Sequence, residues 1–404
     1  MATIVVLGTF DTKGAEHRFL ADAIRTQGHQ PLLVDCGGFG HSQITADISA
    51  GQIAAESGID LAALRAESDR GAMVTAFAAA APHIVRRLHS EGRLGGIVSM
   101  GGSGGTIIGT AAMRSLPLGV PKVMVSTLAS GNVAPYLDVA DIVMIPAVSD
   151  VAGLNVFTRA QFTRAAAAIC ALVDCNARLA VGAVGQSERP LIVASMFGNT
   201  TPCVERARDL LEESGRDVVI FHATGTGGRT MESLIAGGPV AGVLDVTTTE
   251  WADELVGGIL GAGPKRLDAA ATRGIPAVIA PGCLDMVNFG APETVPEKFR
   301  DRRFYQHNAQ VTLMRTTPEE CQDLGKILAE KVNRSTGPAT VLLPLKGISM
   351  ISVAGQPFYD AAADDALFSS IRTFVKVGIP LVELDCAIND PRFAEACVGR
   401  LLAN

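Results

Sequence analysis

Residues 96–106 read G-I-V-S-M-G-G-S-G-G-T, an apolar run followed by a loop with four glycines among five residues. The run has the length of a buried strand, and the residues after Thr106 have the pattern of an apolar helix. A strand that leads through a glycine-rich loop into a helix is typical of an α/β domain. Glycine lets the backbone approach a ligand and direct several N–H groups at it. The loop therefore favours phosphate or carboxylate binding, and its candidate contacts are Gly101, Gly102, Ser103, Gly104, Gly105 and Thr106.

The same alternation of strand and helix runs through the first half of the chain. A strand at Thr3–Leu7, a helix from about Lys13 to Gln27 and a strand at Pro31–Val34 form its first unit. Short strands at Val123–Val125 and Ile142–Ile145 and a helix from about Thr158 to Val173 follow residues 96–106. This order predicts a parallel sheet with helices on its faces.

The pattern restarts in the second half, with a strand at Leu191–Ser195, a helix at Cys203–Glu213 and a strand at Val218–Phe221. Gly96–Met100 corresponds to Gly242–Val246, and Val120–Ser126 corresponds to Ile275–Pro281. Phe10 and Asp35 likewise have counterparts in Phe197 and His222. The sequence therefore predicts two doubly wound, Rossmann-like parallel-sheet subdomains related by duplication. We expect them at residues 1–178 and 190–404, joined by a linker at 179–189.

Composition excludes several classes of protein. The chain has 404 residues, 34 Lys and Arg against 41 Asp and Glu, 48% hydrophobic residues and 5% aromatic residues. It is too apolar for disorder, and its net charge of −7 gives no general attraction to nucleic acid or to an anionic membrane. No signal peptide is visible, and the longest apolar run, Ala165–Val173, is about half of a membrane span. We expect a cytoplasmic protein.

Two further loops of the first half follow predicted strands. Residues 8–14, G-T-F-D-T-K-G, stand where a mononucleotide fold holds phosphate at a helix N-terminus. Alternatively, Asp11 or Thr12 caps that helix. Asp35 ends the next strand and either binds a ribose hydroxyl or lies solvated in a turn. The candidate ligand contacts here are Thr9, Phe10, Asp11, Thr12, Lys13, Asp35 and Gly37, with Ser130 and Asn132 in a later loop.

The second half places different chemistry at strand ends. His222, Glu250, Cys283 and Asp285 are the candidates for a general base or nucleophile, and each is alternatively structural. The histidines show no zinc-ligand spacing, so a metal would be Mg²⁺ held by phosphate and an acid. Asp11 is the candidate acid.

Taken together, the loops resemble the Tm-one-like ATP-binding family, which includes the N-terminal region of the tomato mosaic virus resistance protein and many bacterial proteins. The matching runs are G-T-F-D-T-K-G, D-C-G-G, G-G-S-G-G-T, S-T-L-A-S-G-N, S-M-F-G-N-T-T, H-A-T-G-T-G-G and D-V-T-T-T-E. The resemblance covers essentially the whole chain. It implies ATP and Mg²⁺ bound in the N-terminal half, through Thr9 to Lys13, Asp35 and Gly101 to Thr106, and a homodimer.

Three functions remain open. The first is a cytoplasmic ATP–Mg-binding protein with a second small-molecule or effector site in its C-terminal half. The second is an ATP-independent lyase, isomerase or hydrolase that acts on a small anionic metabolite through His222, Glu250 and Cys283 or Asp285. The third is an interaction protein that ATP stabilises. The many polar loops at strand ends favour the first two, because a scaffold does not require them.

Overall fold

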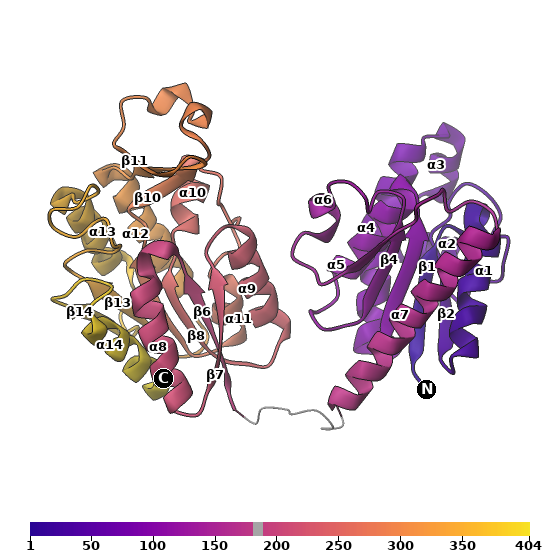
Figure 1. Cartoon of the computed structure of the whole chain (residues 1–404), viewed down its shortest axis with the longest axis horizontal. Helices are drawn as coiled ribbons and strands as arrows, with labels where there is room; N and C mark the ends of the chain where they lie inside the picture. Colours follow the sequence, from indigo (N-terminus) through magenta and orange to yellow (C-terminus); the bar gives the residue numbers. More distant parts are fainter. Residues whose placement is uncertain (181–188) are drawn as a thin grey trace. The chain divides into compact units, whose positions relative to one another are not determined.

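The computed structural model describes residues 1–180 and 189–404 and divides the chain into an N-terminal and a C-terminal unit (Figure 1). The division lies at residues 186 and 187. Both units are parallel sheets flanked by helices, which confirms the predicted α/β fold with two Rossmann-like subdomains. Most of the predicted linker falls on residues 181–188, which lie outside the described residues. Leu179 and the backbone of Ala180 belong to the preceding helix.

The N-terminal unit is a five-stranded sheet in the order β2-β1-β3-β4-β5. Its elements are β1 (Thr3–Gly8), α1 (Phe10–Thr26), β2 (Gln30–Asp35), α2 (Ala50–Ser57), α3 (Leu61–Glu67), α4 (Arg70–Ser90), β3 (Gly96–Gly101), α5 (Ser103–Arg114), β4 (Lys122–Ser126), α6 (Ala134–Leu137), β5 (Val143–Pro146) and α7 (Val156–Ala180). The chain reverses its direction of winding between β1 and β3, which pair in parallel. In such sheets the ligand site lies beyond the carboxyl ends of the strands at this reversal.

The C-terminal unit has six parallel strands in the order β14-β13-β9-β8-β6-β7. Up to its insertion, the elements are β6 (Leu191–Met196), η1 (Gly198–Thr200), α8 (Thr201–Glu213), β7 (Asp217–His222), α9 (Thr226–Gly237), β8 (Val240–Thr247), α10 (Glu250–Val256), α11 (Asp268–Arg273) and β9 (Ala277–Gly282). The last five are α12 (Pro318–Val332), β13 (Ala339–Pro344), α13 (Ala361–Phe374), β14 (Leu381–Leu384) and α14 (Pro391–Ala403).

Between β9 and α12 the C-terminal unit carries an insertion that the sequence patterns did not predict. It is an antiparallel sheet in the order β10-β12-β11, formed by β10 (Met286–Phe289), β11 (Phe304–Asn308) and β12 (Val311–Arg315), with the short helices η2 (Pro292–Thr294) and η3 (Glu297–Phe299). In the parallel sheet of the C-terminal unit, the order β7-β6-β8-β9 repeats the order β2-β1-β3-β4 of the N-terminal unit. This repetition is what a duplication predicts.

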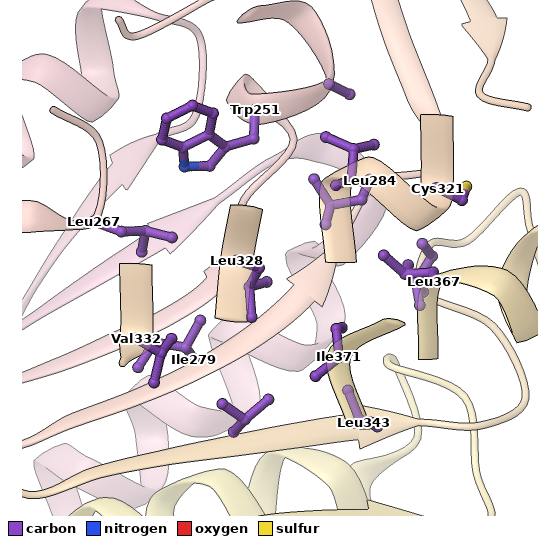
Figure 2. Close-up of a cluster of buried hydrophobic side chains, with 14 of the residues drawn as sticks. Trp251, Leu267, Ile279, Leu284, Cys321, Leu328, Val332, Leu343, Leu367 and Ile371 are labelled. Carbon is purple, nitrogen blue, oxygen red and sulfur yellow. The ribbon is translucent and has the colours of Figure 1, made fainter. Parts of the chain in front are cut away.

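Each central strand is buried on both faces, as parallel strands between two helix layers are. In β1, Ile4 and Val6 pack with α1 and α7, while Val5 and Leu7 pack with α4 and α5. The corresponding layer of the C-terminal unit lies between the sheet and helices α10, α12 and α13. Figure 2 shows its centre, where helix residues such as Trp251, Leu328 and Leu367 belong to one buried cluster with strand residues such as Ile279 and Leu343.

Helix α7 is the one described helix that is long and apolar enough to cross a membrane. Its residues Phe162, Ala165 and Ile169 are buried in the core with α1 and the sheet. Its hydrophobicity is therefore accounted for by packing within the unit. The cytoplasmic location and the homodimer stay predictions.

Candidate functional site

A cavity of about 130 Å³ lies beyond the carboxyl ends of β1 and β3, at the reversal of the N-terminal sheet. It brings together residues from the start of α1, the loop after β2, the start of α5 and α4. Its lining consists of Thr9, Asp11, Thr12, Cys36, Gly37, Gly38, Phe39, Arg70, Met73, Val74, Gly104, Gly105 and Ile108. Six of the predicted ligand contacts are therefore neighbours in space: Thr9, Asp11, Thr12, Gly37, Gly104 and Gly105.

Phe10 and Asp35 form the support of this cavity rather than its wall. Both are buried, and Asp35 Oδ1 accepts hydrogen bonds from the N–H groups of Phe10 (2.9 Å) and Gly37 (2.8 Å). Burial raises the pKa of Asp35, and these two donors oppose the rise. One carboxylate thus ties the loop after β1 to the loop after β2.

Two helix N-termini face this region. Helix α1 follows Thr9, whose side chain accepts no hydrogen bond from the helix, although Asp35 binds the N–H of Phe10, the first residue of α1. Helix α5 follows Gly102, which has no side chain to serve as a cap. The interpretation that Asp11 or Thr12 caps α1 is therefore wrong. The first N–H groups of a helix have no partner within the helix, and its dipole favours an anion there. The two ends together suit a phosphate or carboxylate.

Asp11 places an unsatisfied carboxylate oxygen at the cavity. Its Oδ2 accepts hydrogen bonds from the N–H groups of Phe39 (3.0 Å) and Gly40 (3.2 Å), whereas its Oδ1 is buried with no partner among residues 1–180 and 189–404. A Cβ atom on Gly37 would lie 2.3 Å from this Oδ1, so residue 37 must be glycine for the two loops to approach. A buried polar atom without a partner costs free energy, and Oδ1 therefore calls for a donor or a cation.

Residues of α4 and α5 complete the cavity with apolar surface. Met73, Val74 and Ile108 line it, and a Cβ atom on Gly104 would approach Val74 Cγ2 to 3.0 Å. Arg70, the first residue of α4, adds a positive charge, and Phe39 lies at the rim. Sequence patterns missed these residues. Only Phe39 carried a signal, since it directly follows the D-C-G-G run.

The remaining predicted contacts lie outside the cavity lining. Thr106 is buried and its hydroxyl pairs with that of Ser126 at 2.7 Å, which fixes α5 to the end of β4. Asn132 accepts a hydrogen bond from the N–H of Ala134 and so shapes the exposed loop after β4. The other contacts outside the lining are Lys13, Gly101, Gly102, Ser103 and Ser130.

His17 fixes the first turn of α1 from beneath. Helix α1 is interrupted at Lys13, which has φ −130° and ψ 28°, and His17 Nδ1 lies 2.7 Å from the Lys13 carbonyl oxygen. The imidazole is fully buried, and burial lowers its pKa to about 4. It is therefore neutral at pH 7, with Nδ1–H donating to Lys13. This interruption also explains why the periodic pattern begins at Lys13 although the helix begins at Phe10.

In the C-terminal unit, Glu250 belongs to a buried ionic network. Arg266 donates from Nε to Glu250 Oε2 at 2.6 Å and holds both carboxylate oxygens of Asp245 at 2.5 and 2.6 Å. It also reaches Glu232 at 3.3 Å. Glu250 Oε1 accepts the N–H groups of Gly225 and Gly228 at the start of α9. Both carboxylate oxygens of Glu250 thus have partners within the fold, which favours a structural role.

Of the other three candidate catalytic residues, two share a buried turn and one is exposed on another strand. Cys283 is fully buried with φ +60°, and burial raises the pKa of its thiol well above the ordinary value. Asp285 is also fully buried and accepts a hydrogen bond from the Ser349 hydroxyl at 2.7 Å. His222 is exposed at the end of β7. The structure thus brings Cys283 and Asp285 together beside Ile348 and Ser349, and leaves His222 apart from them.

A larger groove of about 710 Å³ runs between α9 and α11 of the C-terminal unit. Most of the exposed surface of its lining is apolar, with basic residues along it. The lining residues are Arg229, Glu232, Ser233, Ala236, Ala262, Gly263, Pro264, Lys265, Arg266, Asp268, Ala269, Thr272 and Arg273. The groove lies beside the helices, not at the strand-end loops where sequence patterns placed the second site.

Comparison with known families identifies both halves of the chain. Residues 2–178 match the N-terminal domain, and residues 189–404 the C-terminal domain, of the uncharacterised protein family UPF0261. The chain belongs to this family. A UPF0261 protein of Clostridium tetani is 46% identical over 99% of this chain and 98% of its own length. A UPF0261 protein of Rhizobium meliloti is 47% identical at the same coverage.

The chain also has relatives in tomato. The ToMV susceptible protein tm-1(GCR26) of Solanum lycopersicum is 34% identical over 99% of this chain, which spans 55% of the tomato protein. This supports the resemblance to the Tm-one-like proteins, while the match itself says nothing of ATP. Solved structures match more weakly: MurG of Acinetobacter baumannii is 12% identical over 100% of both chains, with a TM-score of 0.23. A likeness at that level carries no argument.

Proposed function

We propose that the N-terminal unit binds ATP together with Mg²⁺ in the cavity between β1 and β3. The observation that carries the proposal is the buried Oδ1 of Asp11, which has no partner among the described residues, beside the N-termini of α1 and α5, of which α5 has no side-chain cap. The helix ends suit an anion, whereas a bare carboxylate oxygen repels one. A magnesium nucleotide satisfies both, since its phosphates suit the helix ends and its cation suits the carboxylate.

The residues present fit Mg²⁺ in the manner usual for nucleotide sites. Mg²⁺ in such sites takes one or two carboxylates, the phosphates of the substrate and several waters. Asp11 supplies one carboxylate oxygen, and its other oxygen is held by Phe39 and Gly40. When bound, the cation would neutralise phosphate charge. The groups of this chain would orient the phosphates, with backbone N–H groups of Gly104 and Gly105 and the charge of Arg70.

The apolar side of the cavity favours a nucleotide over a small anionic metabolite. Met73, Val74 and Ile108 offer no hydrogen bond, so a bare phosphate or a small acid would leave this wall without a matching surface. A nucleotide carries, in one molecule, phosphates and a base whose aromatic face makes no hydrogen bonds. The resemblance of the loop motifs to the Tm-one-like family points to the same ligand.

Calorimetry of the Asp11→Asn protein tests the proposal. Asparagine keeps an oxygen for the N–H groups of Phe39 and Gly40 but loses the negative charge. We expect Mg²⁺ to strengthen ATP binding to the wild type by roughly 10- to 100-fold and to leave binding to Asp11→Asn nearly unchanged. Asp22→Asn, on the exposed side of α1, is the matched control and should behave like the wild type. Equal Mg²⁺ dependence in Asp11→Asn would contradict the proposed role of Asp11.

We propose a second small-molecule site in the groove between α9 and α11, because its volume is that of pockets that enclose small ligands. Its apolar lining and the basic residues Arg229, Lys265 and Arg273 fit an apolar acid. A panel of aromatic and aliphatic carboxylic acids should include at least one that raises the melting temperature of the wild type. The same acid should leave Ala269→Trp, whose indole fills the groove, unshifted. Equal shifts in both proteins would place the acid elsewhere.

A further inference from the structure

Phe39 is an aromatic residue held at the rim of the N-terminal cavity. It is 42% exposed although it lines the cavity. Its N–H is bound by Asp11 Oδ2 at 3.0 Å, and the preceding carbonyl, that of Gly38, accepts a hydrogen bond from Arg65 Nε at 2.5 Å. The backbone on both sides of the ring is therefore fixed, and the position of the ring owes little to packing in the core.

The size of the cavity leaves part of a nucleotide outside it. Pockets that enclose whole small molecules have volumes of about 300–1,000 Å³, and this one has about 130 Å³. The polar groups that suit phosphates, at Asp11 and at Gly104 and Gly105, line the cavity together with its apolar wall. With the phosphates at these groups, the base of a bound nucleotide extends past the apolar wall toward the exposed ring of Phe39.

We propose that Phe39 is the platform on which the nucleobase stacks. Every base presents an aromatic face, so such a platform accepts nucleotides over phosphates and discriminates little among bases. Asp11 then serves both parts of the ligand, since one carboxylate oxygen faces the phosphate side and the other fixes the backbone of Phe39. This inference rests on the proposed binding of ATP in the cavity.

Comparing ATP with tripolyphosphate, which has no base, separates stacking from phosphate binding. We expect Phe39→Ala to weaken ATP binding by roughly 5- to 150-fold and to leave tripolyphosphate binding unchanged, both with Mg²⁺. Phe39→Tyr should retain ATP affinity. Phe157→Ala is the matched control, because Phe157 is 78% exposed at the start of α7 and lies outside the cavity lining. It should bind both ligands like the wild type.

A spectroscopic variant supplies a second readout. The chain has one tryptophan, Trp251, buried in the C-terminal unit, so Phe39→Trp adds an exposed reporter at the rim. ATP should quench this added fluorescence, and tripolyphosphate should not. The inference is overturned if Phe39→Ala binds ATP like the wild type, if it loses both ligands equally, or if ATP leaves the reporter unchanged. A wild type that binds neither ligand would instead overturn the proposed function.

Discussion

Replacing Arg266 by methionine should destabilise the C-terminal unit by about 3–5 kcal/mol, the usual cost of removing one partner from a buried ion pair. Arg266 is 1% exposed and holds Asp245 through both of its oxygens, at 2.5 and 2.6 Å. It also binds Glu250 at 2.6 Å and Glu232 at 3.3 Å. Methionine fills much of the same volume but leaves these three carboxylates facing one another.

Urea unfolding followed by tryptophan fluorescence measures the loss in the relevant unit. Trp251 is the sole tryptophan of the chain and is 8% exposed within the C-terminal core. With a slope of about 1–3 kcal/mol per molar urea, a loss of this size lowers the midpoint by at least about 1 M. Arg372→Met is the control, because the Arg372–Glu383 pair is 39% and 38% exposed and should contribute less than about 1 kcal/mol.

The pH dependence of the urea midpoint tests whether repulsion among the buried carboxylates causes the loss of stability. Burial raises the pKa of Glu232 and the charge of Arg266 opposes the rise, so loss of the guanidinium raises this pKa further in the folded state. The protonated form of Glu232 then stabilises the fold at low pH, and this contribution is lost as pH rises. The difference in the free energy of unfolding between the wild type and Arg266→Met should therefore be smaller at pH 5 than at pH 7. A variant within about 1 kcal/mol of the wild type at pH 7 would refute the reasoning.

Three further predictions concern single residues. The free energy of unfolding of the N-terminal unit should fall by about 3 kcal/mol as the pH is lowered from 6.5 to 4, because the pKa of His17 is 6.5 in the unfolded chain and about 4 in the folded one. Pulse proteolysis should show this pH dependence in the wild type and not in His17→Leu. Leu328→Ala, in the cluster of Figure 2, should cost about 2–5 kcal/mol, measured by Trp251 fluorescence. Gly37→Ala should displace Asp11, since its Cβ would lie 2.3 Å from Oδ1, and calorimetry should show weaker ATP binding in a protein that remains folded.

The fold could be predicted because the strands carry strong local signals. Ile97, Val98 and Met100 are apolar and lie buried between two helix layers, and the glycines that follow mark the end of the strand. The inserted sheet escaped prediction because β11, Phe304–Asn308, is mostly polar and exposed. Such a strand forms through pairing with β12, a partner that no local pattern announces.

The site could be predicted where it depends on loops and not where it depends on packing. Asp11, Gly37 and Gly104 follow recognisable strands, and parallel strands bring their carboxyl ends to one edge. Met73 and Arg70 enter the same cavity from α4, far from any motif, so only the fold reveals them.

The roles of the polar residues in the second half likewise could not be predicted, because they depend on tertiary contacts. Glu250 follows a strand as a catalytic acid would, but its partner, Arg266, comes after an intervening helix and loop. Whether such a carboxylate faces solvent or a guanidinium depends on tertiary contacts. Sequence spacing alone does not distinguish the two.

The most direct test of the central claim is calorimetric titration of the whole chain with ATP and Mg²⁺, repeated with Gly104→Val. A valine side chain at position 104 would press against Val74, since its Cβ atom alone would lie 3.0 Å from Val74 Cγ2, and it would fill the cavity. Position 104 is helical, so valine can adopt the backbone conformation that glycine has there. Gly51→Val, in the exposed first turn of α2, is the matched control. We predict saturable binding to the wild type and to Gly51→Val, and none to Gly104→Val. No heat of binding from the wild type at millimolar ATP, or equal binding by Gly104→Val, would contradict the account.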